Sequence, residues 1–262
     1  MGTPGHKRIQ SVDVLRGLTV ACMILVNNGY GESFSTLRHS AWNGLTLSDM
    51  VFPFFLFVVG LSVNLSRKQD PWQIVRRAGT ILLLGWALAY VEYALRGDFL
   101  PWAHFRLTGV LPRIALCYLG AALLSRRLGT ASLAWCSGIL LGLYTLLIVP
   151  GGGYAADEGN ILCRVDRALL GADHLYRKSV VDPEGLLSTV SSLGHTLLGC
   201  VCGRLLLSEK ALPVRLRRIA LYGALLAAAG LCLHFVLPFN KRIWSPSYAL
   251  LTSGCCALLL AA

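Results

Sequence analysis

Charged residues are scarce in this sequence, and acidic residues are the scarcest. Only 14% of the 262 residues are charged, and the 13 acidic residues are outnumbered by 24 Lys and Arg. A soluble domain carries about 25% charged residues. Here 55% of the residues are hydrophobic, arranged in many long runs. This composition excludes an ordinary soluble domain and predicts an all-α, polytopic helical membrane protein.

Several well-known motifs are also missing. The sequence holds no nucleotide-binding glycine loop, no zinc-ligand spacing and no nucleophile elbow. Eight of its nine cysteines fall in apolar runs, which is typical of helix-packing residues rather than of a disulfide framework. We therefore expect neither a metal site nor cysteine chemistry.

The apolar runs predict about eight transmembrane helices in a single membrane-embedded domain, residues 1–262. Residues 28–47 and 150–185 are predicted to form outer loops, and a loop as long as the second is usually functional or disordered. The last run is still apolar at Ala262, so we expect an incomplete final helix in a chain that is cut short at its C-terminus. The expected spans are residues 12–27, 48–65, 74–95, 109–124, 132–149, 186–207, 219–237 and 247 onward.

Positive charge is distributed unevenly between the two sides of this topology. Fourteen Lys and Arg residues but only three acids fall on the side of the N-terminus, whereas the other side has ten of each. Because Lys and Arg in loops set the orientation, we expect the N-terminus in the cytoplasm. The basic side is expected to meet anionic lipid or a phosphorylated ligand, and not nucleic acid.

A polar and aromatic stretch leads into the second predicted span. It contains His39, Trp42, Asn43 and Asp49. Ionisable groups beside a membrane helix are costly and often functional, and an imidazole can act as a general base near neutral pH. The plainer alternatives are an interfacial histidine and tryptophan, with Asp49 as a first-turn acid. In the functional interpretation, Asp49 orients His39 or pairs with Arg113.

Three further polar residues lie near the ends of predicted helices. Asn27 ends the first span and either stabilises a developing oxyanion or terminates the helix. Arg113, near the start of a span, needs an acid or a polar cavity, and Glu92 and Asp49 are its expected partners. Asp182 precedes a predicted helix and is expected to be its N-cap.

Seven segments resemble the heparan-α-glucosaminide N-acetyltransferase family, and together they cover nearly the whole chain. The block around His39 is the most specific of them. The segments are SVDVLRG (11–17) with Asn27, HSAWNGLT (39–46), DMVFPFF (49–55), GVLPRIA (109–115), VDRALLGADHLY (165–176), DPEGLLST (182–189) and NKRIWS (240–245).

The resemblance implies a polytopic membrane enzyme that takes acetyl-CoA on the cytosolic side and acetylates an amino sugar on the far side. It implies that His39 is the catalytic residue and that Asn27 lies in the same site. Two departures from the family pattern are expected, because the large luminal domain of the animal enzyme and the last helices of the pattern are missing from this sequence. Acetyl-CoA is expected as a co-substrate, without a metal. The expected substrate- or acetyl-binding residues are Asn27, Trp42, Asn43, Asp49 and Arg113, and the expected phosphate-binding residues are Arg67, Lys68, Arg76 and Arg77.

Several alternatives stay open at this point. His39 could act as a base in direct transfer or carry the acetyl group as an acetyl-histidine. The competing functions are transport of an amino sugar, for which no inverted repeat is visible, and a structural membrane protein without turnover. A homodimer is an open alternative to a monomer. The expected location is the plasma membrane of a bacterium, or a lysosomal or other endomembrane of a eukaryote.

Overall fold

The computed structural model describes residues 9–27, 38–66, 70–176 and 179–262, and within these ranges it is helical and has no strands. Two 3₁₀ turns, η2 (Pro101–Ala103) and η3 (Ala172–His174), lie in the connections. The α-helices are α1 (Gln10–Asn27), α2 (Leu47–Leu65), α3 (Pro71–Leu95), α4 (Val110–Arg127), α5 (Thr130–Ile148), α6 (Ile161–Leu170), α7 (Leu186–Leu206), α8 (Leu212–His234) and α9 (Pro246–Ala261).

The described helices confirm a polytopic helical membrane protein. Six of them, α1, α2, α3, α5, α7 and α8, are long and apolar enough to cross a bilayer. The shorter α9 and the arginine-bearing α4 fall at the other two predicted spans. The predicted loop 150–185 contains α6, so much of this long connection is ordered structure.

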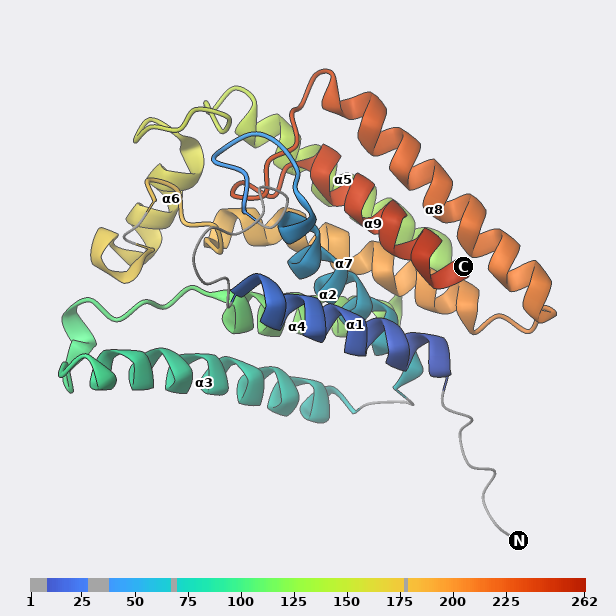
Figure 1. Cartoon of the computed structure of the whole chain (residues 1–262), viewed down its shortest axis with the longest axis horizontal. Coiled ribbons are helices and arrows are strands. Elements are labelled where there is room, and N and C mark those ends of the chain that lie inside the picture. The colour runs from blue at the N-terminus through green and yellow to red at the C-terminus, as the bar shows by residue number, and fades with distance from the viewer. Residues whose placement is uncertain (1–8, 28–37, 67–69, 177–178) are drawn as a thin grey trace, which may run out of the picture.

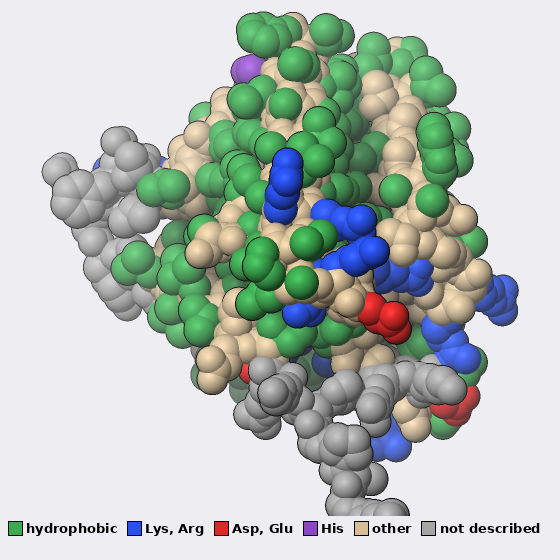
Figure 2. All heavy atoms as spheres, turned by 90° about the vertical axis from the view of Figure 1, so that its right-hand side faces the viewer, with side chains coloured by type: hydrophobic (Ala, Val, Ile, Leu, Met, Phe, Trp, Pro, Cys, Tyr) green, Lys and Arg blue, Asp and Glu red, His purple; other side chains and the backbone are tan. Residues whose placement is uncertain are grey.

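The helices run back and forth between two ends of the molecule, which we call the basic end and the His39 end. The Arg16 Nη2 donates to Ser62 Oγ at 2.7 Å, so the start of α1 lies beside the last turns of α2. This basic end also holds the start of α3 and the end of α4, and Figure 2 shows Lys and Arg side chains gathered on that face. The predicted segregation of charge is therefore present in the fold.

Helices α2 and α7 form the centre of the molecule and approach each other closely at glycines. A Cβ on Gly60 would lie 2.0 Å from the Thr196 backbone oxygen, and one on Gly199 would lie 2.2 Å from the Phe57 backbone oxygen. Such contacts leave no room for a side chain and hold the two backbones in a fixed register. Helix α3, in contrast, packs mainly on α4 along one edge of the molecule (Figure 1) and buries only Ile74 and Ala78.

The prediction that Asp182 caps α7 is wrong. The helix begins at Leu186, with Gly185 at the N-cap position. Asp182 is instead buried and accepts hydrogen bonds from Arg106 Nη2 at 2.8 Å and Thr108 Oγ1 at 2.5 Å. Burial alone would raise the pKa of Asp182, but Arg106 and these hydrogen bonds hold that pKa below its usual value. The position of the Asp182 side chain is thus set by partners far away in the sequence and not by the start of α7.

Candidate functional site

His39 and Asp49 form a hydrogen-bonded pair at the mouth of α2. The His39 Nδ1 lies 2.8 Å from Asp49 Oδ1, and the imidazole is about half exposed while the carboxylate is buried. A carboxylate can only accept, so we assign the proton of the neutral imidazole to Nδ1. The lone pair of Nε2 then remains available to a reacting group, as in an aspartate–histidine dyad.

Asp49 is held by the start of its own helix. It is the third residue of a capping box with Thr46, whose side chain accepts from the Asp49 backbone N–H. The Asp49 Oδ2 accepts from Ser40 N at 3.1 Å and from Thr46 Oγ1 at 3.0 Å. Asp49 therefore begins the helix and orients His39 at the same time, so the two interpretations drawn from the sequence do not exclude each other.

Lys241 completes the charged cluster from the far end of the chain. Its Nζ lies 3.4 Å from Asp49 Oδ1 and 3.2 Å from His39 Nδ1. Burial lowers the pKa of Lys241, although the carboxylates of Asp49 and Glu184 oppose this shift. The arrangement therefore places a largely buried ammonium, a carboxylate and an accessible imidazole next to one another.

Two loops are joined to bring these residues together. The Gly44 N donates to Phe239 O at 2.8 Å, and Asn240 Nδ2 donates to Asn43 Oδ1 at 3.0 Å. Trp42 Nε1 donates to the Tyr154 backbone oxygen at 2.8 Å. Of the predicted binding residues, Trp42 and Asn43 thus anchor the loop that carries His39, and direct binding by either remains a prediction.

The loop that carries Lys241 includes a strained residue. Trp244 has a φ of 51°, which is unusual for a bulky side chain and costs of order 1–3 kcal/mol. Its indole is fully buried and packs edge-on against Phe52 and Tyr248. The Asn240 side chain accepts from the backbone N–H of Arg242, which fixes the same turn. Packing on α2 and α9 thus holds a turn whose position determines where Lys241 lies.

Arg113 is buried, but not against either predicted acid. Its Nη2 donates to the Gly185 backbone oxygen at 3.0 Å, and its guanidinium lies 5.3 Å from the centre of the Trp244 ring. The predicted pairing with Glu92 or Asp49 is wrong, because Glu92 is exposed and pairs with Arg96, and Asp49 pairs with Lys241. Two Arg113 nitrogens, Nε and Nη1, lack hydrogen-bond partners among the described residues. Binding of substrate by Arg113 remains a prediction.

Comparison with known proteins confirms the resemblance inferred from the sequence. The family model described as heparan-alpha-glucosaminide N-acetyltransferase, catalytic, matches residues 8–154, which is more than half of the chain. The chain belongs to the heparan-α-glucosaminide N-acetyltransferase family.

Two curated members of this family share most of the chain. The human heparan-alpha-glucosaminide N-acetyltransferase is 30% identical in an alignment that covers 92% of this chain and 46% of the human protein. The mouse protein of the same name is 29% identical in an alignment that covers 97% of this chain and 48% of the mouse protein. The chain thus spans about half the length of these relatives.

Asn27, Arg76 and Arg77, which were also singled out from the sequence, lie apart from the charged cluster. Asn27 is the exposed last residue of α1, and the structure gives it no contact with His39 among the described residues. Arg67 and Lys68 lie outside the described residues. Arg76 and Arg77 are exposed on α3 at the basic end, as their placement in the sequence predicts.

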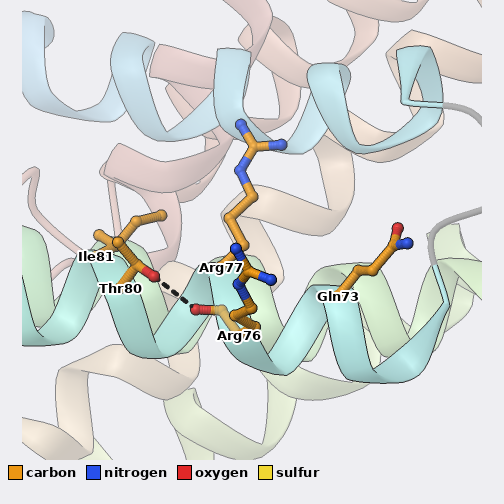
Figure 3. Close-up of a pocket in the computed structure, with 5 residues that line it drawn as sticks. All are labelled: Gln73, Arg76, Arg77, Thr80 and Ile81. Atoms are coloured by element: carbon orange, nitrogen blue, oxygen red, sulfur yellow. Dashed lines mark hydrogen bonds between the residues drawn. The ribbon is translucent and has the colours of Figure 1, made fainter.

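Arg77 separates two hollows at the basic end. One, of about 510 Å³, is lined by Gln73, Arg76, Arg77, Thr80 and Ile81 and is drawn in Figure 3, where Arg77 reaches from α3 toward the neighbouring helices. The other, also about 510 Å³, is a groove between α1, α2, α3 and α4. We call it the helix groove. Its polar lining includes Arg16, Ser62 and Arg77, and its apolar lining includes Phe55, Leu111 and Ile114.

Lys241 is the main residue of the candidate site that was not predicted from the sequence. It stands in a short loop with Arg242 beside it, where charge alone does not distinguish a site residue from a topology signal. The signal that could have identified it was the resemblance of residues 240–245 to the family. The family-model match ends at residue 154, so Lys241 also lies beyond the segment that this model covers.

Proposed function

We propose that this chain is an acetyl-CoA-dependent N-acetyltransferase that passes an acetyl group to the amine of a glucosamine-type sugar. The observation that carries the proposal is the His39–Asp49–Lys241 cluster at the mouth of α2. It combines an accessible imidazole, a carboxylate that orients it and a cation, which are the groups that acyl transfer to an amine requires. The names of the human and mouse relatives support glucosamine as the acceptor.

We place the acetyl donor at the basic end. Arg76 and Arg77 are exposed there, and guanidinium groups bind phosphates well. The apolar lining of the helix groove suits the pantetheine arm, with Arg16 and Arg77 at its polar part. Phe55 lines the groove, and Asp49 lies six residues nearer the start of the same helix. At a rise of about 1.5 Å per residue, the groove therefore ends about 9 Å along α2 from Asp49. The thioester must therefore pass the aromatic side chains of α2 to reach His39.

The reaction follows from the groups in the cluster. The sugar amine attacks the thioester carbonyl carbon, and His39 Nε2 accepts a proton from the amine as the C–N bond forms. Lys241 Nζ lies on the Nδ1 side of the His39 ring, and its role in the proposal is to supply positive charge that stabilises the negative oxygen of the tetrahedral intermediate. The C–S bond then breaks, and CoA leaves as a thiolate that can take the proton from His39. Asp49 accepts from Nδ1–H throughout and keeps Nε2 directed at the reacting atoms.

A covalent route uses the same residues in a different order. His39 Nε2 attacks the thioester carbonyl carbon, and the C–S bond breaks so that CoA leaves as a thiolate. The amine then attacks the acetyl carbon, the bond from that carbon to Nε2 breaks, and the proton lost by the amine passes to the thiolate. Mixing the protein with acetyl-CoA labelled in the acetyl group, without an acceptor, distinguishes the routes. Label retained on the protein and lost in a His39→Ala variant indicates the covalent route.

The proposal is tested with purified protein in liposomes and acetyl-CoA added on one side only. We expect N-acetylglucosamine to form from glucosamine supplied on the opposite side, and we propose that the N-terminus faces the acetyl-CoA side. A matched preparation of His39→Ala should form no product. Import of glucosamine without acetylation would instead support a transporter.

A further inference from the structure

A pocket at the His39 end is not used by the proposed chemistry. It has a volume of about 570 Å³ and lies between α3, α4, the connection 96–109 and residues 175–176. We call it the loop pocket. Its volume falls within the range of about 300–1,000 Å³ that is usual for ligand sites. Its lining includes Trp86, Tyr93, Asp98, His104, Arg106 and Tyr176.

The walls of the loop pocket are fixed by hydrogen bonds. Trp86 Nε1 donates to the Leu107 backbone oxygen at 3.0 Å, and Tyr93 OH donates to the His104 backbone oxygen at 3.0 Å. The His104 Nε2 lies 2.6 Å from Asp98 Oδ2. A helix and the connection that follows it are thus tied together around the space, so the pocket is formed without a ligand. Preformed pockets of this kind are usual for small-molecule sites.

The loop pocket borders the residues that surround the charged cluster. Arg106 lines the pocket, and its Nη2 donates to Glu184 Oε2 at 2.7 Å and to Asp182 Oδ1 at 2.8 Å. Glu184 in turn interacts electrostatically with Lys241, which contacts His39. Arg106 and Glu184 thus connect the lining of the loop pocket to the surroundings of Lys241.

The charges around the loop pocket indicate what kind of ligand it takes. Arg106 is neutralised by two carboxylates, and Arg96 pairs with Glu92 at 2.6 Å. Both arginines of the lining thus have carboxylate partners within the part of the chain that the structure describes. A polyanionic ligand would have to break these pairs. The Asp98 carboxylate and the aromatic walls instead suit hydroxyl groups, amines and the apolar faces of sugar rings.

We propose that the loop pocket binds the sugar units attached to the acceptor amino sugar, and that it takes uncharged or amine-bearing units rather than sulfated ones. This inference rests on the proposed function for the identity of the acceptor. It makes the pocket a specificity site: His39 acts on the terminal amine, while the pocket selects the chain behind it.

The experiment compares two acceptors, glucosamine and the β-1,4-linked tetramer of glucosamine. We expect the KM of the parent protein to be lower for the tetramer. Trp86→Ala should raise the KM for the tetramer by roughly threefold to tenfold and leave that for glucosamine unchanged, because an aromatic contact contributes about 0.5–1.5 kcal/mol. The control is Trp102→Ala. Trp102 is an exposed aromatic residue of the connection 96–109, and it does not line the pocket. Equal effects of the two variants would overturn the proposal.

A binding measurement separates this proposal from the proposed reaction. Calorimetry with the tetramer and the His39→Ala protein needs no acetyl transfer, and we expect binding that Asp98→Asn weakens. Asp98→Asn also replaces Trp86→Ala if that variant fails to fold. Tetramer binding without any acetyl transfer by the parent protein would support the pocket and refute the reaction. Tighter binding of a sulfated heparin tetrasaccharide than of the glucosamine tetramer would overturn the proposed selectivity.

Discussion

The two ends of this molecule handle charge in opposite ways. At the His39 end, Asp49 and Asp182 are buried and lie close to their cationic partners, Lys241 and Arg106. At the basic end, Arg76, Arg77 and Arg217 are exposed, and Arg76 and Arg77 line open hollows. The first end fixes these two carboxylates in its interior, whereas the second presents these three arginines at its surface.

This difference fits two different tasks. Acyl transfer needs groups held in place before the reaction begins, because a small displacement of a base or a cation lowers the rate. Binding of a flexible polyphosphate needs charge more than it needs fixed geometry, and it weakens with salt. Substitutions at the His39 end should therefore change the rate of turnover, whereas substitutions at the basic end should change the affinity for acetyl-CoA.

The largest effect is expected for His39→Ala. Loss of a positioned base lowers the rate by about 10²–10⁴, and loss of a covalent acetyl carrier lowers it further. Because the proposed phosphate contacts lie at the other end, the affinity for acetyl-CoA should stay nearly unchanged. Turnover is measured with glucosamine, and acetyl-CoA affinity by calorimetry on the same preparation. A folded variant that acetylates glucosamine at the parent rate would refute the mechanism.

A smaller loss of rate is expected for Lys241→Met. The change removes the ammonium that lies 3.2 Å from His39 Nδ1. Removal of one group that stabilises a developing oxyanion costs about 10²–10³ in kcat. Lys241→Arg keeps the charge and should retain more activity, which makes it the matched control. If Lys241 only neutralises Asp49, Lys241→Met should lower the melting temperature and leave kcat near the parent value.

At the basic end, the double variant Arg76→Gln with Arg77→Gln should raise the KM for acetyl-CoA. An effect of roughly tenfold corresponds to about 1.4 kcal/mol of lost phosphate contacts. Its kcat should be unchanged, and its KM should depend less on salt than that of the parent protein. Arg217→Gln provides the control, because Arg217 is exposed on α8 and lines neither hollow. Equal KM values in the double variant and the control would assign these arginines to topology alone.

Most of the fold could be predicted from the sequence. Long apolar runs and turn residues predicted a helix at each of the eight expected spans, and six of these helices are long and apolar enough to cross a membrane. The reason is that a segment in lipid must satisfy its backbone internally and so becomes a helix. The part that could not be predicted is the pairing of charges across distant loops. Asp182 carried a local capping signal, yet its partners Arg106 and Thr108 stand more than 70 residues away.

In the candidate site, too, the local contact could be predicted from the sequence and the distant one could not. His39 and Asp49 are ten residues apart and flank one helix start, so their contact could be expected from local sequence. Lys241 reaches them only because the turn at Asn240 is tied to Asn43 and the strained Trp244 packs on α2. No local pattern encodes that contact, because it depends on the packing of helices that are far apart in the chain.

The smallest expected effect is on stability and concerns Asp166, a buried acid at the His39 end that has no cationic partner at short distance among the described residues. Asp166, on α6, is buried, and its Oδ2 has no hydrogen-bond partner among the described residues. Burial raises the pKa of Asp166 from 3.8 to about 6. The folded protein thus holds this proton more tightly than the unfolded chain. The contribution to stability is complete below about pH 4 and is lost as the pH rises to about 6.

Asp166→Asn tests this expectation, because the amide is a neutral group of nearly the same shape. At pH 4.5 the variant and the parent protein should have similar melting temperatures. At pH 7.5 the variant should be the more stable, by at most roughly 3 kcal/mol, which is what a shift of about two pKa units corresponds to. Thermal unfolding in detergent at four pH values between 4.5 and 7.5 measures the difference. A gap between the two proteins that does not change with pH would mean that Asp166 is charged in the folded protein over this whole range. Its carboxylate would then be stabilised as effectively as those of Asp49 and Asp182.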